Sequence, residues 1–457
     1  AIPTKFLQMS DDHDPDHGAA RYRAVPSSRL GRFAGFGRLA GGIAGGMMAE
    51  GARRLASGER ITAEELLLTP GNARRLADRL SHLRGAAMKL GQMISMDAGD
   101  FLPRELSDIL ATLRERAHFM PARQLDRVLS EEWGQDWRRQ FRWFNPRPIA
   151  AASIGQVHKA LTRDGEELAI KVQYPGVAAS IDADVDNVAS LLRLSGLLPD
   201  SLDLEPLLAA AKEQLREEAD YQREGEQMQL YAARMAGNPH FVVPRLHDGL
   251  TRARILAMSF EEGVAIETLA GEPQELRNEV FGRLIRLVLC ELFEFGAMQT
   301  DPNFANYRYR RSDGAIVLLD FGAARAIEPH VSEGYRRLLA AGLSGDPARV
   351  REEALAIGFV NEAVLTRQRE RVDRMIAIIT TEMNRDAPFD FGNRAFVPLL
   401  REEGMAIAQD RASWHIPPAE TLFVQRKVSG TALLGARLKA VVNVRALVQD
   451  MLQGQPG

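Results

Sequence analysis

The stretch of sequence that decides the fold is QTDPNFAN, residues 299–306, followed by the apolar run AIVLLDFG, residues 315–322. Asp301 and Asn306 stand five positions apart, and Asp320 follows Asn306 by fourteen. Phosphoryl-transfer sites need a positioned carboxylate and oxygen side chains that hold Mg²⁺, because catalysis there is mostly positioning and charge neutralisation. The spacing of these three residues therefore favours a site of that kind.

A lysine upstream agrees with this interpretation. The β-type run ELAIKVQ, residues 167–173, places Lys171 where protein kinases carry the lysine of their V-A-I-K strand, and D-x-x-x-x-N and D-F-G are the kinase catalytic-loop and metal-binding elements. Taken singly, each feature is also typical of an ordinary strand end or turn. All three in this order predict a kinase-like fold. We expect an α+β, bilobal architecture with a helical N-terminal extension and a mostly helical C-lobe.

Two features separate the chain from ordinary protein kinases. Where a glycine-rich phosphate loop is expected, the sequence reads AAASIGQV, residues 150–157. Side chains there restrict how closely a backbone wraps phosphates, whereas glycine allows a close approach. Far upstream, GAAMKLGQM, residues 85–93, is compatible with a helix that projects Lys89 and Gln92 from one face.

Composition excludes several classes of protein. The 457 residues carry 58 Lys and Arg against 61 Asp and Glu, so the formal net charge is −3 and no basic field favours a nucleic-acid partner. A hydrophobic content of 45% and a charged content of 26% are typical of globular proteins. Cys290 is the single cysteine, which excludes an internal disulfide, and we expect it to be a buried small apolar residue.

The pattern along the chain predicts four parts. Residues 1–30 lack periodicity and are expected to be a flexible arm, and residues 31–145 a helical extension that ends near FNPRP, residues 144–148. We predict an N-lobe over 146–262 and a C-lobe over 263–457. Strand-like runs are expected at 149–161 and 167–174, joined by a tight turn, and within 241–260. The C-lobe is expected to be helical apart from 315–322.

Membrane contact is a separate hypothesis. The longest uncharged candidate, LAGGIAGGMMA, residues 39–49, is shorter than the roughly 18 residues that a span requires. Small residues recur at intervals of three and four within Gly31–Leu55, and arginines flank them. The segment is interpreted either as a lead-in that packs on its own domain, or as a contact with an anionic membrane surface or a second copy.

Together the motifs resemble the UbiB family of atypical kinase-like proteins, in its ubiquinone-biosynthesis branch. The resemblance extends from about Gly31 to beyond Asp320. The motifs that carry it are K-x-G-Q (Lys89, Gly91, Gln92), the AAAS loop, AIKVQYPGV, E-x-D (Glu218, Asp220) followed by YQRE, MQTDPNFANY and LLDFGAAR.

The resemblance implies a role for each matched residue. Lys171 would contact the nucleotide phosphates and pair with a carboxylate, for which Glu218 and Glu224 both remain candidates. Asn306 and Asp320 would hold Mg²⁺, and Asp301 would be the catalytic-loop carboxylate. Ala151, Ala152 and Ser153 would form the loop over the nucleotide, and the E-x-D motif is matched by Glu218 and Asp220.

The K-x-G-Q motif affects the expected reaction. In the family this helix crosses the region where a protein substrate would dock, so Lys89 and Gln92 are expected to face the active site and to disfavour phosphorylation of proteins in trans. Gln299-Thr300 stands where kinases have His-Arg, which points the same way. The alternative for Lys89 and Gln92 is that they brace the helical extension.

The resemblance implies an ATP-binding, Mg²⁺-dependent ATPase that supports ubiquinone biosynthesis at the cytoplasmic side of an inner membrane. ATP and ADP, isoprenoid quinone intermediates, an anionic membrane surface, biosynthetic enzymes and a second copy are the expected partners. A small-molecule, lipid or protein kinase of the same fold is the first alternative. A nucleotide-sensing scaffold, in which binding rather than turnover matters, is the second.

Overall fold

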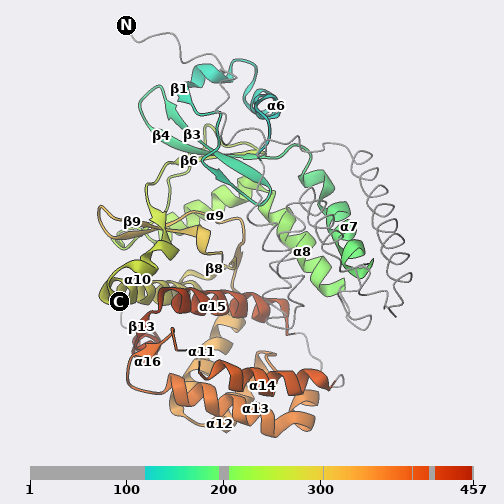
Figure 1. Cartoon of the computed structure of the whole chain (residues 1–457), viewed down its shortest axis with the longest axis vertical. Helices are drawn as coiled ribbons and strands as arrows, with labels where there is room; N and C mark the ends of the chain where they lie inside the picture. The colour runs from blue at the N-terminus through green and yellow to red at the C-terminus, as the bar shows by residue number, and fades with distance from the viewer. Residues whose placement is uncertain (1–118, 195–204, 302, 394, 411–416, 455–457) are drawn as a thin grey trace, which may run out of the picture. The chain divides into compact units, whose positions relative to one another are not determined.

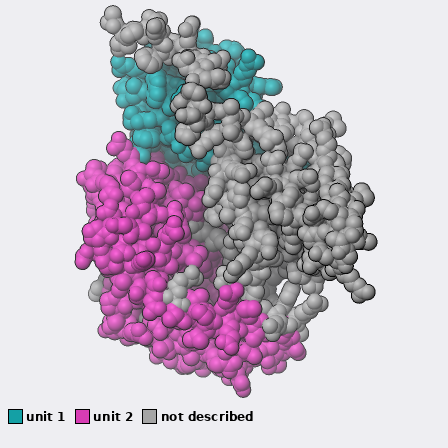
Figure 2. Space-filling model, viewed as in Figure 1, with its two compact units in different colours: residues 1–229, 245–261 teal, residues 230–244, 262–457 magenta. Residues whose placement is uncertain are grey.

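The computed structural model describes residues 119–194, 205–301, 303–393, 395–410 and 417–454 (Figure 1). The predictions for the arm, for Gly31–Leu55 and for Lys89 and Gln92 lie outside these residues. The described part forms two compact units, coloured in Figure 2. Unit 1 comprises the described residues of 1–229 and 245–261, and unit 2 comprises those of 230–244 and 262–457.

Unit 1 is built on an antiparallel sheet with the strand order β1-β3-β4-β6, and a short strand, β2, pairs with β3. The elements of this part are α6 (Ala122–Trp133), η3 (Trp137–Gln140), β1 (Phe141–Phe144), β2 (Ala150–Ala151), β3 (Gly155–Thr162), β4 (Glu167–Gln173), η4 (Ala178–Ser180), α7 (Ile181–Leu194), α8 (Glu205–Glu218), α9 (Tyr221–Arg234, unit 2 from Leu230) and β6 (Ile255–Ser259).

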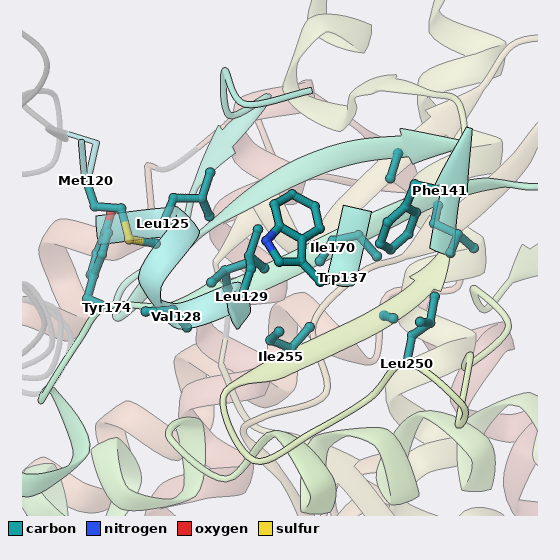
Figure 3. Packing of buried hydrophobic residues seen from close by; sticks show 14 residues of the cluster. Met120, Leu125, Val128, Leu129, Trp137, Phe141, Ile170, Tyr174, Leu250 and Ile255 are labelled. Atoms are coloured by element: carbon teal, nitrogen blue, oxygen red, sulfur yellow. The ribbon is translucent and has the colours of Figure 1, made fainter. Parts of the chain in front are cut away.

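One face of this sheet is covered by the amphipathic helix α6. Its buried side chains, Leu125, Val128 and Leu129, recur at helical spacing and so share one face. They join Ile170 of β4 and Ile255 of β6 in one apolar cluster, shown in Figure 3. Successive side chains of a strand project to opposite faces. Lys171, the neighbour of Ile170, therefore projects from the face that α6 does not cover.

Unit 2 combines three small sheets with long helices. Its elements are β5 (Phe241–Val242), β7 (Val264–Ala265), η5 (Ile266–Gly271), α10 (Gln274–Cys290), η6 (Glu291–Phe295), β8 (Ala297–Gln299), η7 (Phe304–Asn306), β9 (Tyr307–Arg310), β10 (Ala315–Leu318), β11 (Ala324–Ala326), α11 (Pro329–Ser344), α12 (Pro347–Ala356), α13 (Glu362–Met383), β12 (Phe389–Asp390), α14 (Val397–Gln409), α15 (Ala419–Leu438), β13 (Val441–Val442) and α16 (Val444–Leu452).

The sheets of unit 2 hold the segments around the catalytic-loop motif. One sheet has the order β5-β10-β9-β7, and β11 pairs with β8 in a second. Tyr307 of β9 is paired with Leu318 of β10, so the residues after the loop and those before Asp-Phe-Gly lie on neighbouring strands. Helix α15 packs on α10, where Gly435 leaves room for the ring of Phe281: a Cβ on this glycine would lie 2.3 Å from the ring.

The hairpin predicted from 149–161 and 167–174 is confirmed as β3 and β4, whose turn contains Gly165 at φ 90°. The strand runs expected within 241–260 are confirmed as β5 and β6. The helical pattern expected up to Phe144 is wrong at its end, because Phe141–Phe144 forms β1 and pairs with β3. Aromatic residues suit such a half-buried strand, and Phe141 packs against Trp137.

The prediction that the C-lobe is helical outside 315–322 is also wrong in detail. Short strands form at β7, β8, β9 and β11, and β12 pairs with β13. Strands of two to four residues are too short to show a period in sequence, and the partners of β7, β8 and β12 lie more than 20 residues along the chain. These segments therefore become strands only because the fold brings them beside a pairing partner.

Two smaller expectations can be compared with the structure. Among the helices that the structure describes, none has both the length and the apolar character needed to cross a bilayer. Cys290, predicted to be buried, is half-buried at the end of α10. Partial burial and the neighbouring Glu294 raise the pKa of its thiol to about 12.

Candidate functional site

The centre of the site in unit 1 is a buried ion pair between β4 and α9. Lys171 Nζ donates to Glu224 Oε1 and Oε2, both at 2.9 Å. Lys171 is 8% exposed and Glu224 is 1% exposed, so the pair is held away from bulk water. The ring of Tyr221 lies one helical turn before Glu224, with its centroid 5.1 Å from Lys171 Nζ. The sequence left two glutamates as partners for Lys171, and the structure gives it Glu224.

Glu218, the other candidate, is bonded to the alanine-rich loop. Its Oε2 accepts a hydrogen bond of 2.6 Å from Ser153 Oγ. Helix α8 ends at Glu218, and Asp220 directly precedes α9: its Oδ1 accepts from Arg223 N at 3.0 Å. The E-x-D motif is therefore the junction of α8 and α9, with Glu218 directed to the loop and Asp220 exposed.

The alanine-rich loop forms a short hairpin at the start of β3. Ala150 and Ala151 form the exposed strand β2 and pair with β3, and Ala152 N donates to Gly155 O at 2.9 Å. Gly155 has no room for a side chain, because a Cβ there would lie 2.5 Å from Val172 O and 2.8 Å from the Tyr221 hydroxyl oxygen. Glycine is therefore needed at the closure of the loop, while alanines occupy its exposed edge.

In unit 2, a network of backbone bonds holds the catalytic-loop motif. Asp301 Oδ1 accepts from Asn303 N at 3.2 Å, so the carboxylate is bonded to the backbone two residues further on. Asn306 Nδ2 donates to Asp301 O at 3.4 Å, and Asn306 O accepts from Leu319 N at 3.0 Å. Asn306 is 7% exposed. The loop thus ties Asp301 to Asn306, and Asn306 to the residue before Asp320.

The Asp-Phe-Gly segment is held by its own backbone and by Gln299 of β8, the strand that pairs with β11. Asp320 Oδ1 accepts from Gly322 N at 3.0 Å, and Asp320 O accepts from Gln299 Nε2 at 3.2 Å. Phe321 is buried, with its ring centroid 5.1 Å from that of Tyr231. Asp301, Asn306 and Asp320 are therefore brought together within unit 2 by their own loop and by the β8–β11 ladder.

The donor atoms of this group fit a hard divalent cation. Asp301 and Asp320 supply carboxylate oxygens, and the hydrogen bond of Asn306 Nδ2 leaves the amide oxygen as the atom that can ligate. Oxygen donors of this kind suit Mg²⁺, which takes one or two carboxylates and completes its octahedron with water or phosphate oxygens. Asn306 and Asp320 are the residues that would hold such an ion.

The predicted residues thus form two groups. Unit 1 contains the lysine, the glutamates and the loop, and unit 2 contains the catalytic loop and Asp-Phe-Gly. Sequence reasoning did not single out Glu291 and Lys427, which unit 2 buries beside the catalytic loop. One signal was present: Glu291 interrupts the apolar run LVLCELFEF, residues 287–295, where an unpaired carboxylate would be costly.

Comparison with known proteins identifies the family. The ABC1 atypical kinase-like domain matches residues 112–354. The atypical kinase COQ8B, mitochondrial, of Rattus norvegicus is 37% identical over 433 residues, which cover 94% of this chain and 82% of that protein. The atypical kinase coq-8, mitochondrial, of Caenorhabditis elegans is 35% identical over 462 residues, covering 98% of this chain and 61% of that one.

A solved structure gives the same result for the fold. The complex of Rv3197 with erythromycin from Mycobacterium tuberculosis aligns with a TM-score of 0.59 at 25% identity, over 82% of this chain and 94% of that one. The kinase-like fold predicted from the motifs is confirmed. The chain therefore belongs to the ABC1 atypical kinase-like family, which is the UbiB family that its motifs resemble.

Proposed function

We propose that this protein is an ATP-binding, Mg²⁺-dependent kinase-like ATPase that supports ubiquinone biosynthesis. The observation that carries the proposal is the buried pair of Lys171 and Glu224, because a lysine held by a helix carboxylate is the arrangement that active kinases use to position phosphates. The relatives of Rattus norvegicus and Saccharomyces cerevisiae, which each cover 94% of this chain, are named atypical kinases of the COQ8 type, and these names support the pathway assignment.

Each group of the site has a separate task in this proposal. Lys171, fixed by Glu224, binds the α- and β-phosphates of ATP, and the loop of Ala151, Ala152 and Ser153 covers the nucleotide. Asn306 and Asp320 hold Mg²⁺, which neutralises phosphate charge when bound. Asp301 orients the attacking group.

Two sequence features favour water over a protein hydroxyl as the acceptor. Gln299-Thr300 replaces the His-Arg of protein kinases, and the K-x-G-Q helix with Lys89 and Gln92 is expected to cover the protein-docking region. Lys89 and Gln92 lie outside the described residues, so their proposed place rests on the family resemblance.

The proposed setting is the surface of an inner membrane. The relatives of Rattus norvegicus and Saccharomyces cerevisiae are named mitochondrial. The family resemblance implies a pathway that handles membrane-embedded isoprenoid quinone intermediates. We propose a peripheral, cytoplasm-facing location, with an anionic membrane surface, biosynthetic enzymes and a second copy as partners. Gly31–Leu55 is the segment proposed for membrane or dimer contact.

The deciding experiment follows the γ-phosphate. Purified protein is incubated with γ-labelled ATP and Mg²⁺, with and without anionic liposomes, beside Asp320→Asn, and both free phosphate and labelled products are measured. The proposal expects free phosphate that rises with liposomes and is lost in Asp320→Asn.

Other outcomes assign the protein differently. Label on protein or lipid would make it a kinase. ATP binding without either signal would favour a nucleotide-sensing scaffold, in which Asp301→Asn leaves function intact while Lys171 variants that abolish binding do not. For the loop, Ala151→Gly is expected to change nucleotide affinity, and unchanged ATP and ADP affinities would contradict the proposed position of the loop.

A further inference from the structure

A charged side chain of α15 is buried behind the catalytic loop. Lys427 is 1% exposed, and its Nζ lies 3.1 Å from Glu291 Oε2 and donates to the hydroxyl of Tyr307 at 2.9 Å. Burial lowers the pKa of Lys427, but Glu291 and Tyr307 raise it by more, and the net shift is upward. Lys427 lies beyond residue 354, where the match to the ABC1 domain ends.

Glu291, the first partner of Lys427, is bonded to the backbone just before the catalytic loop. Glu291 Oε1 accepts from the backbone N of Gln299 at 3.1 Å, and Gln299 is two residues before Asp301. The same oxygen accepts from the Tyr231 hydroxyl at 2.8 Å, and the ring of Tyr231 contacts Phe321 of Asp-Phe-Gly. Glu291 is therefore bonded directly to the segment before Asp301, and it is linked to Asp-Phe-Gly through the ring of Tyr231.

Tyr307, the second partner of Lys427, lies at the end of the catalytic loop. Tyr307 directly follows Asn306 and begins β9, which pairs with the strand that runs to Asp320. The Lys427 bond fixes the side chain of the residue next to Asn306 and requires the Tyr307 ring to stay buried. Through its two partners, Lys427 is connected to both ends of the catalytic loop.

Stability alone does not account for this arrangement. Replacing a buried ion pair by apolar residues of similar volume is often neutral or stabilising, because the desolvation penalty offsets the attraction. The directed bonds of such a pair can instead fix neighbouring groups in one geometry. Two groups that the pair bonds lie next to the candidate metal site, because Tyr307 follows Asn306 and the side chain of Gln299 donates to Asp320 O.

We propose that Lys427 is a positioning residue, which holds the catalytic loop and its metal ligands in register through Glu291 and Tyr307. Lys427 then links helix α15 to the catalytic loop. The inference rests on the proposed function, since it needs Asn306 and Asp320 to act on Mg²⁺ with bound ATP. Outer partners of metal ligands typically change metal affinity or activity 10–100-fold when they are removed.

The test uses three variants of the full chain. Tyr307→Phe removes one hydroxyl and keeps the ring. Lys427→Met with Glu291→Gln removes both buried charges together, and Lys427→Met alone leaves the carboxylate unpaired. Arg437→Met is the matched control, because Arg437 lies on the same helix and is exposed. Its ion pair with Glu267 is long, at 3.9 Å, and open to solvent. Each is assayed for ATP hydrolysis against Mg²⁺ concentration, for ATP binding by calorimetry with and without Mg²⁺, and for thermal unfolding.

The expected result separates positioning from folding. Tyr307→Phe and the double variant remain folded at the assay temperature, and each needs roughly tenfold more Mg²⁺ for half-maximal hydrolysis or loses turnover by a similar factor. ATP binding without Mg²⁺ stays at the wild-type level, and Arg437→Met matches wild type throughout. Lys427→Met alone has the lowest unfolding temperature.

Two different failures can be told apart. If Tyr307→Phe and the double variant keep the wild-type Mg²⁺ requirement and turnover, the inference is overturned and the ATPase proposal stands. If the wild-type chain neither hydrolyses ATP nor binds it in a Mg²⁺-dependent manner, the proposed function itself is overturned. In the first case, a lowered unfolding temperature would show that the contacts of Lys427 have a structural role only.

Discussion

Lys171 Nζ donates to both carboxylate oxygens of Glu224 at 2.9 Å, across a gap of 53 residues in the sequence. The contact joins a strand to a helix and resolves a choice that the motifs left open. Both side chains are almost fully buried. If one of them is removed, bulk water cannot solvate the charge that remains. This property makes stability and activity separable by mutation.

Lys171→Met is expected to destabilise the protein by roughly 3–5 kcal/mol, because it leaves the Glu224 carboxylate buried without its partner. The double variant with Glu224→Gln removes both charges of this pair and is expected to recover most of that stability. Nucleotide binding should be lost in both, since the lysine is absent. Urea unfolding and calorimetric ATP titration measure the two properties.

A surface ion pair of unit 1 provides the control. Arg216 and Asp182 are 2.6 Å apart and more than half exposed, so Arg216→Met should change stability by less than about 1 kcal/mol. If the Lys171 and Glu224 double variant bound ATP as tightly as wild type, the proposed role of the lysine would be wrong.

Ser153 and Glu218 provide a second test, directed at the loop. Ser153→Ala removes a bond of 2.6 Å to a carboxylate, and bonds to charged groups contribute about 1.5–3 kcal/mol. Without the bond the loop must be ordered when nucleotide binds, so we expect affinity for ADP to fall by about tenfold. Ser153→Thr keeps the hydroxyl and should retain most of the affinity. Equal ADP affinity in Ser153→Ala and wild type would show that the bond does not prepare the loop for nucleotide.

Gly155 is expected to tolerate no side chain. A Cβ at this position would lie 2.5 Å from a backbone oxygen of the neighbouring strand, so Gly155→Ala must move the strand or the loop. Overpacking of this kind typically costs about 1–3 kcal/mol. Gly271→Ala is the matched control, because a Cβ there has no atom within 4 Å. Thermal unfolding measured by tryptophan fluorescence would contradict the prediction if both variants unfolded at the same temperature.

Local patterns were sufficient for the parts of the fold that have a period or a motif. The β3–β4 hairpin was predictable because two β-type runs flank Arg163-Asp164-Gly165, and the kinase-like fold because three motifs occur in one order. Strand β1 was not, because Phe141–Phe144 becomes a strand only through pairing with β3. Likewise, the strands β8 and β11 exist because they pair around the catalytic loop.

The candidate site shows the same division. Motif residues such as Lys171, Asp301 and Asp320 could be selected from sequence, whereas the choice between two glutamates required the direction of the α8–α9 junction. Lys427 carries no motif, and it lies 136 residues from its partner Glu291. Burial of a charge is a property of the packed core, so sequence spacing alone does not reveal it.

A buried histidine in unit 1 makes the stability of the sheet depend on pH. His158 Nδ1 lies 2.8 Å from Asn145 O, and its Nε2 lies 2.8 Å from the amide nitrogen of Gln156. Gln156 Oε1 in turn accepts from Met120 N at 2.8 Å, which directs the amide nitrogen to the ring. The neutral ring therefore donates from Nδ1 and accepts at Nε2. Burial lowers the pKa of His158 from 6.5 to about 4, against the raising effect of the Asn145 carbonyl.

The sign of the effect follows from which state binds the proton. Between pH 6.5 and about 4, His158 is protonated in the unfolded chain and neutral in the folded chain. The stability that the neutral buried ring allows is therefore fully present above pH 6.5 and is lost as the pH falls. At 1.36 kcal/mol per pKa unit, the loss is about 2 kcal/mol by pH 5. His158→Gln cannot titrate, so its free energy of unfolding should fall less between pH 7.5 and pH 5. Urea unfolding monitored by Trp133 and Trp137, which pack beside this sheet, measures the difference, and parallel pH curves for the two proteins would contradict it.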